Sequence, residues 1–312
     1  MAEERRPTPD SCAAHCRAVA EPLAASAPAA FRHWLCLELP PPWPADAWDA
    51  LGATPLHAIL RQWQAAKLGL RLQLLRGGNS KTAPQAPPAL WWATTTQPGA
   101  TLWSLPATAV TALAALPLET LSQNQGPAHW GSTVQATPLS TPRILVCTHA
   151  RRDPCCARLG LPLFQALHAH APDWVWQTSH LGGHRFAPVV QLLPSSVTLG
   201  QLRTADAAAW LRALEAGRMH DLHNYRGRAG QPAPVQAADA ALRRQHGIDA
   251  IDAVVWRGEW QAHESHTDVT LWIEREAWHA RLLQHPSSAL RPASCGAAAS
   301  PWTNWKVQLT RL

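Results

Sequence analysis

The chain has 312 residues, of which 46% are hydrophobic and 15% charged, and its formal net charge is +6. This composition is enough for a sizeable core and argues against a disordered chain. The arginines are scattered, no segment reaches the roughly 18 apolar residues of a membrane span, and the N-terminus has no apolar signal region. We therefore expect a cytoplasmic chain without a nucleic acid or membrane partner, whose positive charge suits an acidic protein partner.

The first part of the chain predicts an N-terminal segment followed by an α/β domain. Residues 1–29 are rich in Ala and Pro and place Cys12 and Cys16 one turn apart on a short helix. The domain at 30–125 is predicted to hold, in order, a strand at 34–39, a helix at 55–67, a strand at 70–75, strands at 90–96 and 101–105, and a helix at 108–116. A loop at 84–88 and a turn at Pro98-Gly99 separate its later strands.

The second domain, at 140–218, repeats this order of elements. It is predicted to hold a strand at 143–147, a helix at 156–170, a strand at 174–178, paired strands at 189–193 and 197–202, and a helix at 204–216 capped by Thr204. The segment Leu75–Asn79 also aligns with His180–His184. We interpret the repeat as an internal duplication, and the element order is typical of a thioredoxin-like fold.

Residues 219–312 are predicted to form a small α+β extension. It begins with a loop at 223–230, in which Arg226 and Arg228 are solvated or line the mouth of a site, and continues with a helix at 233–246. Strands follow at 253–260, 268–273 and 305–309, and a loop at 285–301 contains Cys295. The predicted fold class is therefore α/β (α+β), with tandem thioredoxin-like domains of which the first is degenerate, and this C-terminal extension.

Cysteine and histidine side chains gather on two neighbouring loops of the second domain. Cys147 ends a predicted strand, Cys155 and Cys156 begin the next helix, and the following strand runs into His180-Leu181-Gly182-Gly183-His184. Loops at the carboxyl ends of strands are where α/β sheets place their sites, and the two glycines allow both imidazoles to turn toward one centre. In a cytoplasmic chain such clustered cysteines indicate a metal or redox site rather than disulfides.

These residue types alone leave two cofactors open. Two thiolates and two imidazoles suit a tetrahedral zinc ion as well as an iron–sulfur cluster. Zinc sites usually space their cysteines by two to four residues, whereas eight residues separate Cys147 from Cys156, which argues against zinc.

The pattern resembles the sucrase/ferredoxin-like family. The resemblance is carried by Cys147-Thr148-His149, the spacing to Cys156, the segment His180–Pro188, Tyr225–Arg228 and, more weakly, Ser294-Cys295-Gly296. It implies a thioredoxin-fold ferredoxin whose [2Fe–2S] cluster has Cys147 and Cys156 on one iron and His180 and His184 on the other. The spacing favours Cys156 over Cys155 as the second thiolate. The first domain has Glu38, Leu75 and Asn79 near the aligned positions, so we expect it to carry no cluster.

The implied function is one-electron transfer with a reductase or acceptor protein. Neutral imidazoles in place of thiolates make a cluster easier to reduce, as in Rieske centres at roughly −150 to +300 mV against about −400 mV for plant-type ferredoxins. Imidazole ligands also titrate, so reduction can be coupled to proton uptake. The candidates for supporting the ligands are His149, Arg151, Arg152, Cys155, Gly182 and Gly183. The arginines would stabilise the added electron or dock an acidic donor, and Cys155 would be a bystander or a thiol able to replace Cys156. The ligand set favours an electron carrier over an enzyme, and any enzyme would be an oxidoreductase.

Two other functions are compatible with parts of the same pattern. The first is a zinc-stabilised Cys2His2 binding module without redox activity. The second is a thiol oxidoreductase using Cys155-Cys156 or Cys12 and Cys16, which is least favoured because the chain lacks a Cys-x-x-Cys motif. Of the remaining residues, Cys12 and Cys16 are expected to be solvent-exposed thiols rather than metal ligands, Cys36 a core residue, and His263, His266 and His279 surface residues, while Cys295 has no assigned role.

Overall fold

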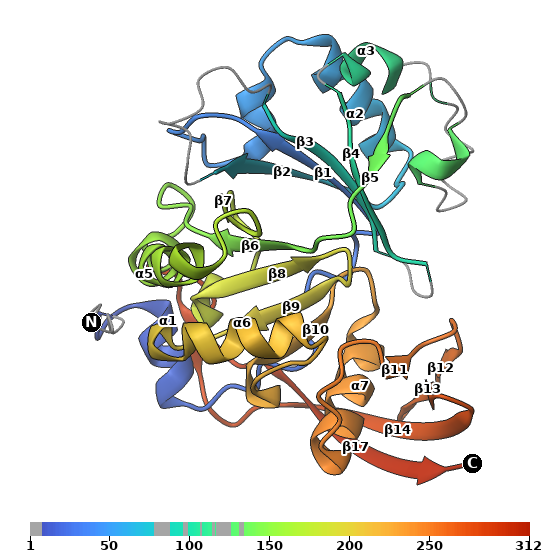
Figure 1. Ribbon diagram of the computed structural model, residues 1–312. Coiled ribbons are helices and arrows are strands. Elements are labelled where there is room, and N and C mark those ends of the chain that lie inside the picture. The colour runs from blue at the N-terminus through green and yellow to red at the C-terminus, as the bar shows by residue number, and fades with distance from the viewer. Residues whose placement is uncertain are drawn as a thin grey trace.

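The computed structural model describes residues 8–77, 88–95, 99–106, 108–113, 116, 126–130 and 134–312 (Figure 1). The described part is a mixed α+β protein, as predicted, built on one large sheet with helices packed against it. Most of the predicted loop at 84–88, Pro98 of the predicted turn, and Asn79 lie outside the described residues. Among the described helices, none is long and apolar enough to cross a membrane.

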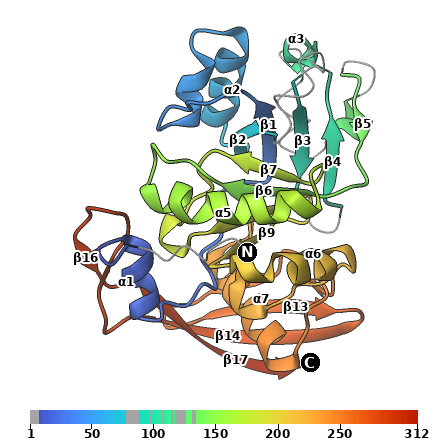
Figure 2. The same ribbon diagram turned by 60° about the vertical axis from the view of Figure 1, so that its left-hand side comes forward.

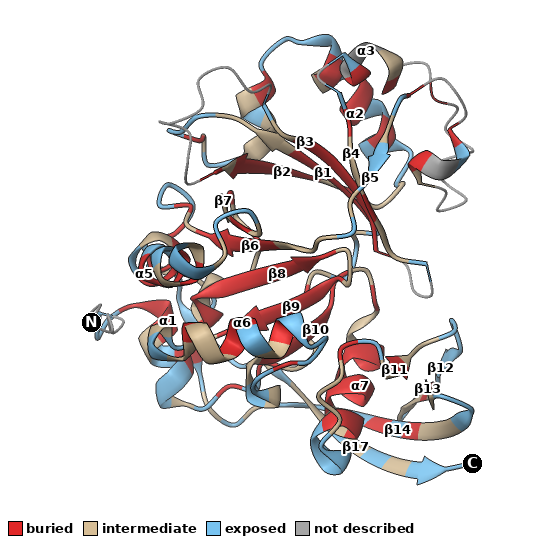
Figure 3. Cartoon of the chain, in the orientation of Figure 1, coloured by how far each residue is buried: buried red, intermediate tan, exposed pale blue. Residues whose placement is uncertain are grey.

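Ten strands form the large sheet in the order β10-β9-β8-β6-β7-β2-β1-β3-β4-β5. Its first-half strands are β1 (His33–Glu38), β2 (Leu70–Arg76), β3 (Leu90–Thr94), β4 (Thr101–Ser104) and β5 (Thr137–Pro138). Its second-half strands are β6 (Arg143–Cys147), β7 (Val175–Thr178), β8 (Val189–Leu193), β9 (Val197–Gly200) and β10 (Tyr225–Arg228). The red strands of Figure 3 show that most of this sheet is buried, which explains their nearly continuous apolar sequences.

The two halves of the sheet repeat one pairing scheme. β1 pairs parallel with β2 and antiparallel with β3, which pairs antiparallel with β4. β6 likewise pairs parallel with β7 and antiparallel with β8, which pairs antiparallel with β9. β2 and β7 pair antiparallel and join the halves into one sheet. The division into two thioredoxin-like domains remains an interpretation, and this repeated pairing agrees with it.

Each half of the sheet carries its own helices and core. In the first half, α2 (Pro55–Ala65) follows β1, and α3 (Ala109–Leu113) follows β4. In the second half, α5 (Pro154–His170) follows β6, and α6 (Ala207–Glu215) follows β9. A third apolar cluster lies between the halves and contains Cys36, Cys147 and Cys156. The sheet end that carries the predicted ligands is thus buried where the two halves meet.

The C-terminal extension is a second sheet with one helix. Helix α7 (Ala233–His246) has the predicted bounds and packs on a sheet of β11 (Val254–Val255), β12 (Trp260–Ala262), β13 (Thr267–Ile273), β14 (Glu276–Pro286) and β17 (Thr303–Arg311). The chain between β14 and β17 crosses the molecule as β15 (Arg291–Pro292) and β16 (Ala299–Ser300), and reaches helix α1 (Cys12–Ala18). Figure 2 shows α1 beside β16, so segments from both ends of the chain lie together.

Three sequence predictions about local structure were wrong, and one long strand was missed. Residues 225–228 of the predicted loop form β10 because Arg226 and Arg228 are buried and bonded rather than solvated. The long strand β14 was not predicted, and the predicted strand at 253–260 is reduced to β11 and the start of β12. Thr204 does not cap a helix but begins a short 3-10 turn, η4 (Thr204–Asp206), before α6.

Helix α5 packs against the end of β6 through Gly160. A Cβ atom at this position would lie 2.0 Å from the carbonyl oxygen of Cys147, so no side chain fits without moving the strand or the helix. Replacing Gly160 by Ala should therefore lower the free energy of unfolding by about 1–3 kcal/mol through overpacking. Urea denaturation measures the change, with exposed Gln165→Ala on the same helix as the control. A change within about 0.5 kcal/mol, typical of surface substitutions, would contradict this packing argument.

Candidate metal centre

Three of the four predicted ligands meet at the end of β6. The Sγ atoms of Cys147 and Cys156 and a ring nitrogen of His180 all lie within 4.8 Å of one another. The Nδ1 atom of His180 is 3.7 Å from Cys156 Sγ and 4.0 Å from Cys147 Sγ. Both cysteines are buried. A metal ion or cluster could therefore bind two thiolates and one imidazole here with small movements of the side chains.

The sequence around Cys156 explains its placement. Asp153 caps helix α5, since its Oδ1 accepts the backbone N–H of Cys155 at 2.8 Å, and Pro154 begins the helix with a fixed φ. Cys156 is therefore in the first turn of the helix, next to the end of β6 that carries Cys147. The family spacing and the structure agree that Cys156, and not Cys155, faces Cys147.

The loop that carries His180 is held by residues from both halves. Arg71 on β2 donates to the carbonyl oxygen of His180 at 2.5 Å, and Gln73 donates to Ser179 O at 2.6 Å. Gly183 has a φ of +71°, and a Cβ there would lie 2.3 Å from the guanidinium of Arg226. That buried arginine donates to Gly182 O at 3.1 Å, so the two glycines let the loop close over it.

The fourth predicted ligand, His184, lies beside this trio but is not part of it. Its ring centroid is 5.2 Å from that of His180. Nε2 of His184 donates to Ala293 O at 3.0 Å and lies 3.5 Å from Asp153 Oδ2. Among the described residues, no group hydrogen bonds to its buried Nδ1. The tautomer protonated on Nε2 leaves the lone pair of Nδ1 available for a metal. Burial lowers the pKa of His184, which favours this neutral imidazole.

Of the candidate supporting residues, His149 and Arg152 lie next to His180. The Nδ1 atom of His149 accepts the backbone N–H of His180 at 3.2 Å, and His149 itself is buried rather than exposed on a loop. A pocket of about 240 Å³ is lined by His149, Arg152 and His180. Arg151 is exposed on the same loop. His180 therefore lines a cavity at the surface, and Arg151 and Arg152 place positive charge on the loop beside it.

The hydrogen bond between the two thiols of the trio shifts their pKa values in opposite directions. Burial would raise the pKa of Cys147, but hydrogen bonds from Cys156 and His180 lower it well below the usual value. The hydrogen bond to Cys147 raises the pKa of Cys156, and burial adds to the effect. The contact between the two sulfurs therefore favours ionisation of Cys147 over Cys156, and a metal that bound both would displace the proton of Cys156.

A second cluster, which the sequence did not predict, lies next to the first. It consists of Cys12 at the start of α1, Asp153, Cys155 and Cys295. The prediction that Cys12 and Cys16 are solvent-exposed thiols is wrong, since both are fully buried. Cys16 is outside this cluster, and its sulfur accepts from Gln201 Nε2 at 3.8 Å. Cys36 is a core residue, as predicted.

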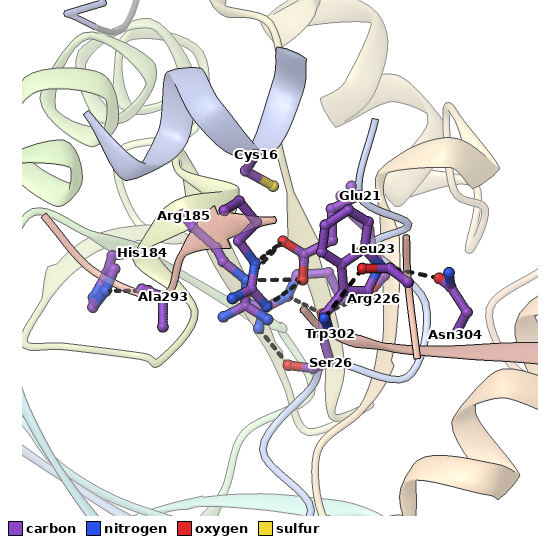
Figure 4. A network of polar contacts seen from close by, with 12 residues as sticks. Cys16, Glu21, Leu23, Ser26, His184, Arg185, Arg226, Ala293, Trp302 and Asn304 are labelled. Carbon is purple, nitrogen blue, oxygen red and sulfur yellow. Dashed lines mark hydrogen bonds and ion pairs between the residues drawn. The ribbon is translucent and has the colours of Figure 1, made fainter. Parts of the chain in front are cut away.

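A buried carboxylate ties the N-terminal segment to the histidine loop. Figure 4 shows Glu21 beside Arg185, the neighbour of His184. The Nε atom of Arg185 is 3.0 Å from both oxygens of Glu21, and Arg291 of β15 donates to the same carboxylate at 2.6 and 2.9 Å. Burial would raise the pKa of Glu21, but the two arginines lower it below its ordinary value. Glu21 therefore stays ionised and joins three distant segments.

Three histidines of the extension, predicted to be unrelated surface residues, surround one carboxylate. His263, His266 and His279 each have Nε2 within 3.3 Å of an oxygen of Asp268. Arg281 also donates to Asp268, at 3.1 Å. The three histidines are partly exposed, and Arg281 already neutralises the carboxylate of Asp268. This group is therefore a surface ion-pair network.

Comparison with known proteins supports the resemblance drawn from the motifs. The model of the sucrase/ferredoxin-like family matches residues 23–227, which is more than half of the chain and includes Cys147, Cys156, His180 and His184. Comparison with curated proteins and with solved structures gave no match. The chain belongs to the sucrase/ferredoxin-like family.

Proposed function

We propose that the chain is a one-electron transfer protein that holds a [2Fe–2S] cluster, with Cys147 and Cys156 on one iron and His180 and His184 on the other. The observation that carries this proposal is the convergence of two buried thiols and His180 Nδ1 within 4.8 Å. The family match covers all four residues. Thiolates are the ligands that iron–sulfur clusters prefer, and imidazole replaces two of them in Rieske centres.

The orientation of His184 fits a ligand of the second iron. Its Nε2–H is bound to Ala293 O, and its Nδ1 is buried with no hydrogen bond to any described residue. A buried ring nitrogen without a partner is costly unless it binds something. The hydrogen bond on the opposite nitrogen is the arrangement that fixes metal-bound histidines.

When bound, the cluster supplies one reversible electron, and this chain's residues set the conditions for it. His180 lines the 240 Å³ pocket, so the ring edge away from the thiols can exchange a proton with water. Arg152 lines the same pocket and favours the added negative charge. We propose that His180 takes up a proton when the chain is reduced, and that Arg151 and Arg152 dock an acidic reductase or acceptor.

A zinc-stabilised Cys2His2 module at the same residues is the alternative, and the colour of the protein distinguishes the two. Protein purified under anaerobic conditions should be brown, contain two irons per chain, and bleach when dithionite is added. A colourless protein in which zinc depends on Cys147 would reject the electron-transfer function and favour the zinc module.

Changing one histidine ligand to cysteine should separate the roles of the imidazoles. His180→Cys and His184→Cys should each keep a cluster, because thiolate is a good ligand, but should lower its reduction potential. Each variant should also flatten the dependence of the potential on pH, since one titrating imidazole is gone. Protein-film voltammetry from pH 6 to 9 measures both effects, with surface His279→Cys as the control. An unchanged pH dependence in both ligand variants would contradict bis-histidine ligation.

A further inference from the structure

We propose that Cys12, Cys155, Cys295 and Asp153 form a second metal site, which binds one zinc ion independently of the candidate cluster. The three Sγ atoms form a nearly equilateral triangle, with Cys12–Cys155 and Cys12–Cys295 at 3.6 Å and Cys155–Cys295 at 3.5 Å. Three sulfurs bound tetrahedrally to one zinc at about 2.3 Å lie about 3.8 Å apart. The observed triangle is therefore almost the size that a single zinc ion requires.

A carboxylate is in the position of the fourth ligand. Asp153 Oδ1 is 3.5 Å from Cys295 Sγ, and Oδ2 is 3.9 Å from Cys12 Sγ. Sulfur and oxygen atoms bound to one tetrahedral zinc lie about 3.6 Å apart. Backbone N–H groups of Cys155 and Cys295 donate to Asp153 at 2.8 and 3.2 Å, which orients the carboxylate toward the sulfurs. Asp153, Cys12 and Cys155 are buried, and a divalent cation would compensate their negative charge.

The arrangement fits a metal better than a thiol pair. A disulfide joins only two sulfurs, at about 2.05 Å, and leaves the third thiol and the carboxylate without a function. Here the three cysteines are free thiols with equal spacing. Soft thiolates together with one carboxylate favour zinc over magnesium or calcium, which prefer oxygen ligands.

The site is separate from the candidate cluster, although Cys155 and Cys156 are adjacent. Consecutive residues of a helix point about 100° apart, so these two thiols face different centres. Cys12 and Cys295 also lie outside residues 23–227, the part that matches the family. The ligands come from α1, the start of α5 and the chain between β15 and β16. Zinc would thus link α1 and the segment between β15 and β16 to α5, the helix that carries Cys156. It would also hold Ala293 where its carbonyl oxygen accepts the Nε2–H of His184.

Metal analysis of purified protein tests the proposal because iron and zinc are counted separately. Protein expressed with both metals should hold one zinc per chain, and that zinc should remain in Cys147→Ser, which removes a ligand of the candidate cluster only. Cys12→Ala and Cys295→Ala should lose the zinc, or bind it at least tenfold more weakly, while keeping their iron. Cys36→Ala, which removes a buried thiol that belongs to neither group of candidate ligands, should change neither metal.

Two readouts that leave the proposed zinc ligands unchanged keep the test valid if an alanine variant fails to fold. The zinc-free chain, titrated with Co²⁺, should show one equivalent of tetrahedral thiolate–cobalt absorption in the Cys147→Ser background. Cys295 is the most exposed of the three thiols, so bound zinc should make its alkylation slower than in the zinc-free chain. The proposal is overturned if the purified chain lacks zinc and binds no Co²⁺ in that background, if two of the three thiols are disulfide-linked, or if zinc is unchanged in both alanine variants. Loss of iron alone bears only on the electron-transfer function.

Discussion

Replacing Glu21 by Gln should lower the free energy of unfolding at pH 7 by about 3–5 kcal/mol, the usual cost of removing one partner from a buried ion pair. Glu21 and Arg291 are each 5% exposed. Water therefore cannot replace the carboxylate as the partner of the Arg291 guanidinium. Arg185 loses the same partner. The amide of Gln can still accept one hydrogen bond, but it supplies no negative charge between the two guanidinium groups.

The pH dependence of this loss follows from the lowered pKa of Glu21. A carboxyl whose pKa is lower in the folded than in the unfolded chain stabilises the fold above the unfolded value, near 4.5, and this contribution is lost as the pH falls through the folded value. The difference between the unsubstituted chain and Glu21→Gln should therefore be largest near neutral pH and shrink in acid. Urea denaturation at several pH values measures it.

The matched control for this experiment is Glu276→Gln. Glu276 also pairs with an arginine, Arg311, but both side chains are about half exposed, at 46% and 60%. Exposed pairs contribute at most about 1 kcal/mol, so the same substitution should have a small effect there. Equal effects at the two positions would show that burial of Glu21 does not give its ion pairs their strength.

Local patterns predicted the parts of the fold where hydrophobicity and turn residues agree. β6 and α7 have the predicted bounds, and the apolar run before Cys147 and the Pro and Gly at the ends of α7 explain this success. β10 was missed because arginines at alternate positions are typical of a solvated loop. Their burial depends on carbonyl acceptors from elsewhere: Arg226 donates to Gly182 O and Ser26, and Arg228 to Ser195 O and Ile251 O. No local pattern could show those acceptors.

The candidate metal ligands likewise fall into a group that local sequence could predict and a group that it could not. Cys147, Cys156 and His180 could be predicted because spacing along two adjacent loops brings them to one sheet edge. The triangle of Cys12, Cys155 and Cys295 could not, because 143 and 140 residues separate its outer members from Cys155. In the sequence, Cys12 is paired only with Cys16, and no other cysteine lies near Cys295. Only the crossing of the chain after β14 brings them to α5.

The adjacent cysteines of α5 should give opposite results when each is changed to serine. Cys156→Ser should lose the iron and the brown colour, since Cys156 Sγ faces His180 Nδ1 at 3.7 Å together with Cys147. Cys155→Ser should keep the iron and the colour, because its sulfur faces Cys12 and Cys295 at 3.6 and 3.5 Å. Iron and acid-labile sulfide per chain, measured on anaerobically purified protein, give the comparison.

This pair of variants is its own control, because the two substitutions are identical in chemistry and one residue apart in the same buried helix turn. A general loss of stability at the start of α5 would reduce the iron content in both. Retention of iron in Cys156→Ser with loss in Cys155→Ser would exchange the two assignments and contradict the geometry at His180. Loss in Cys156→Ser alone would support the view that neighbouring thiols of one helix serve two separate centres, since the two residues point about 100° apart on the helix.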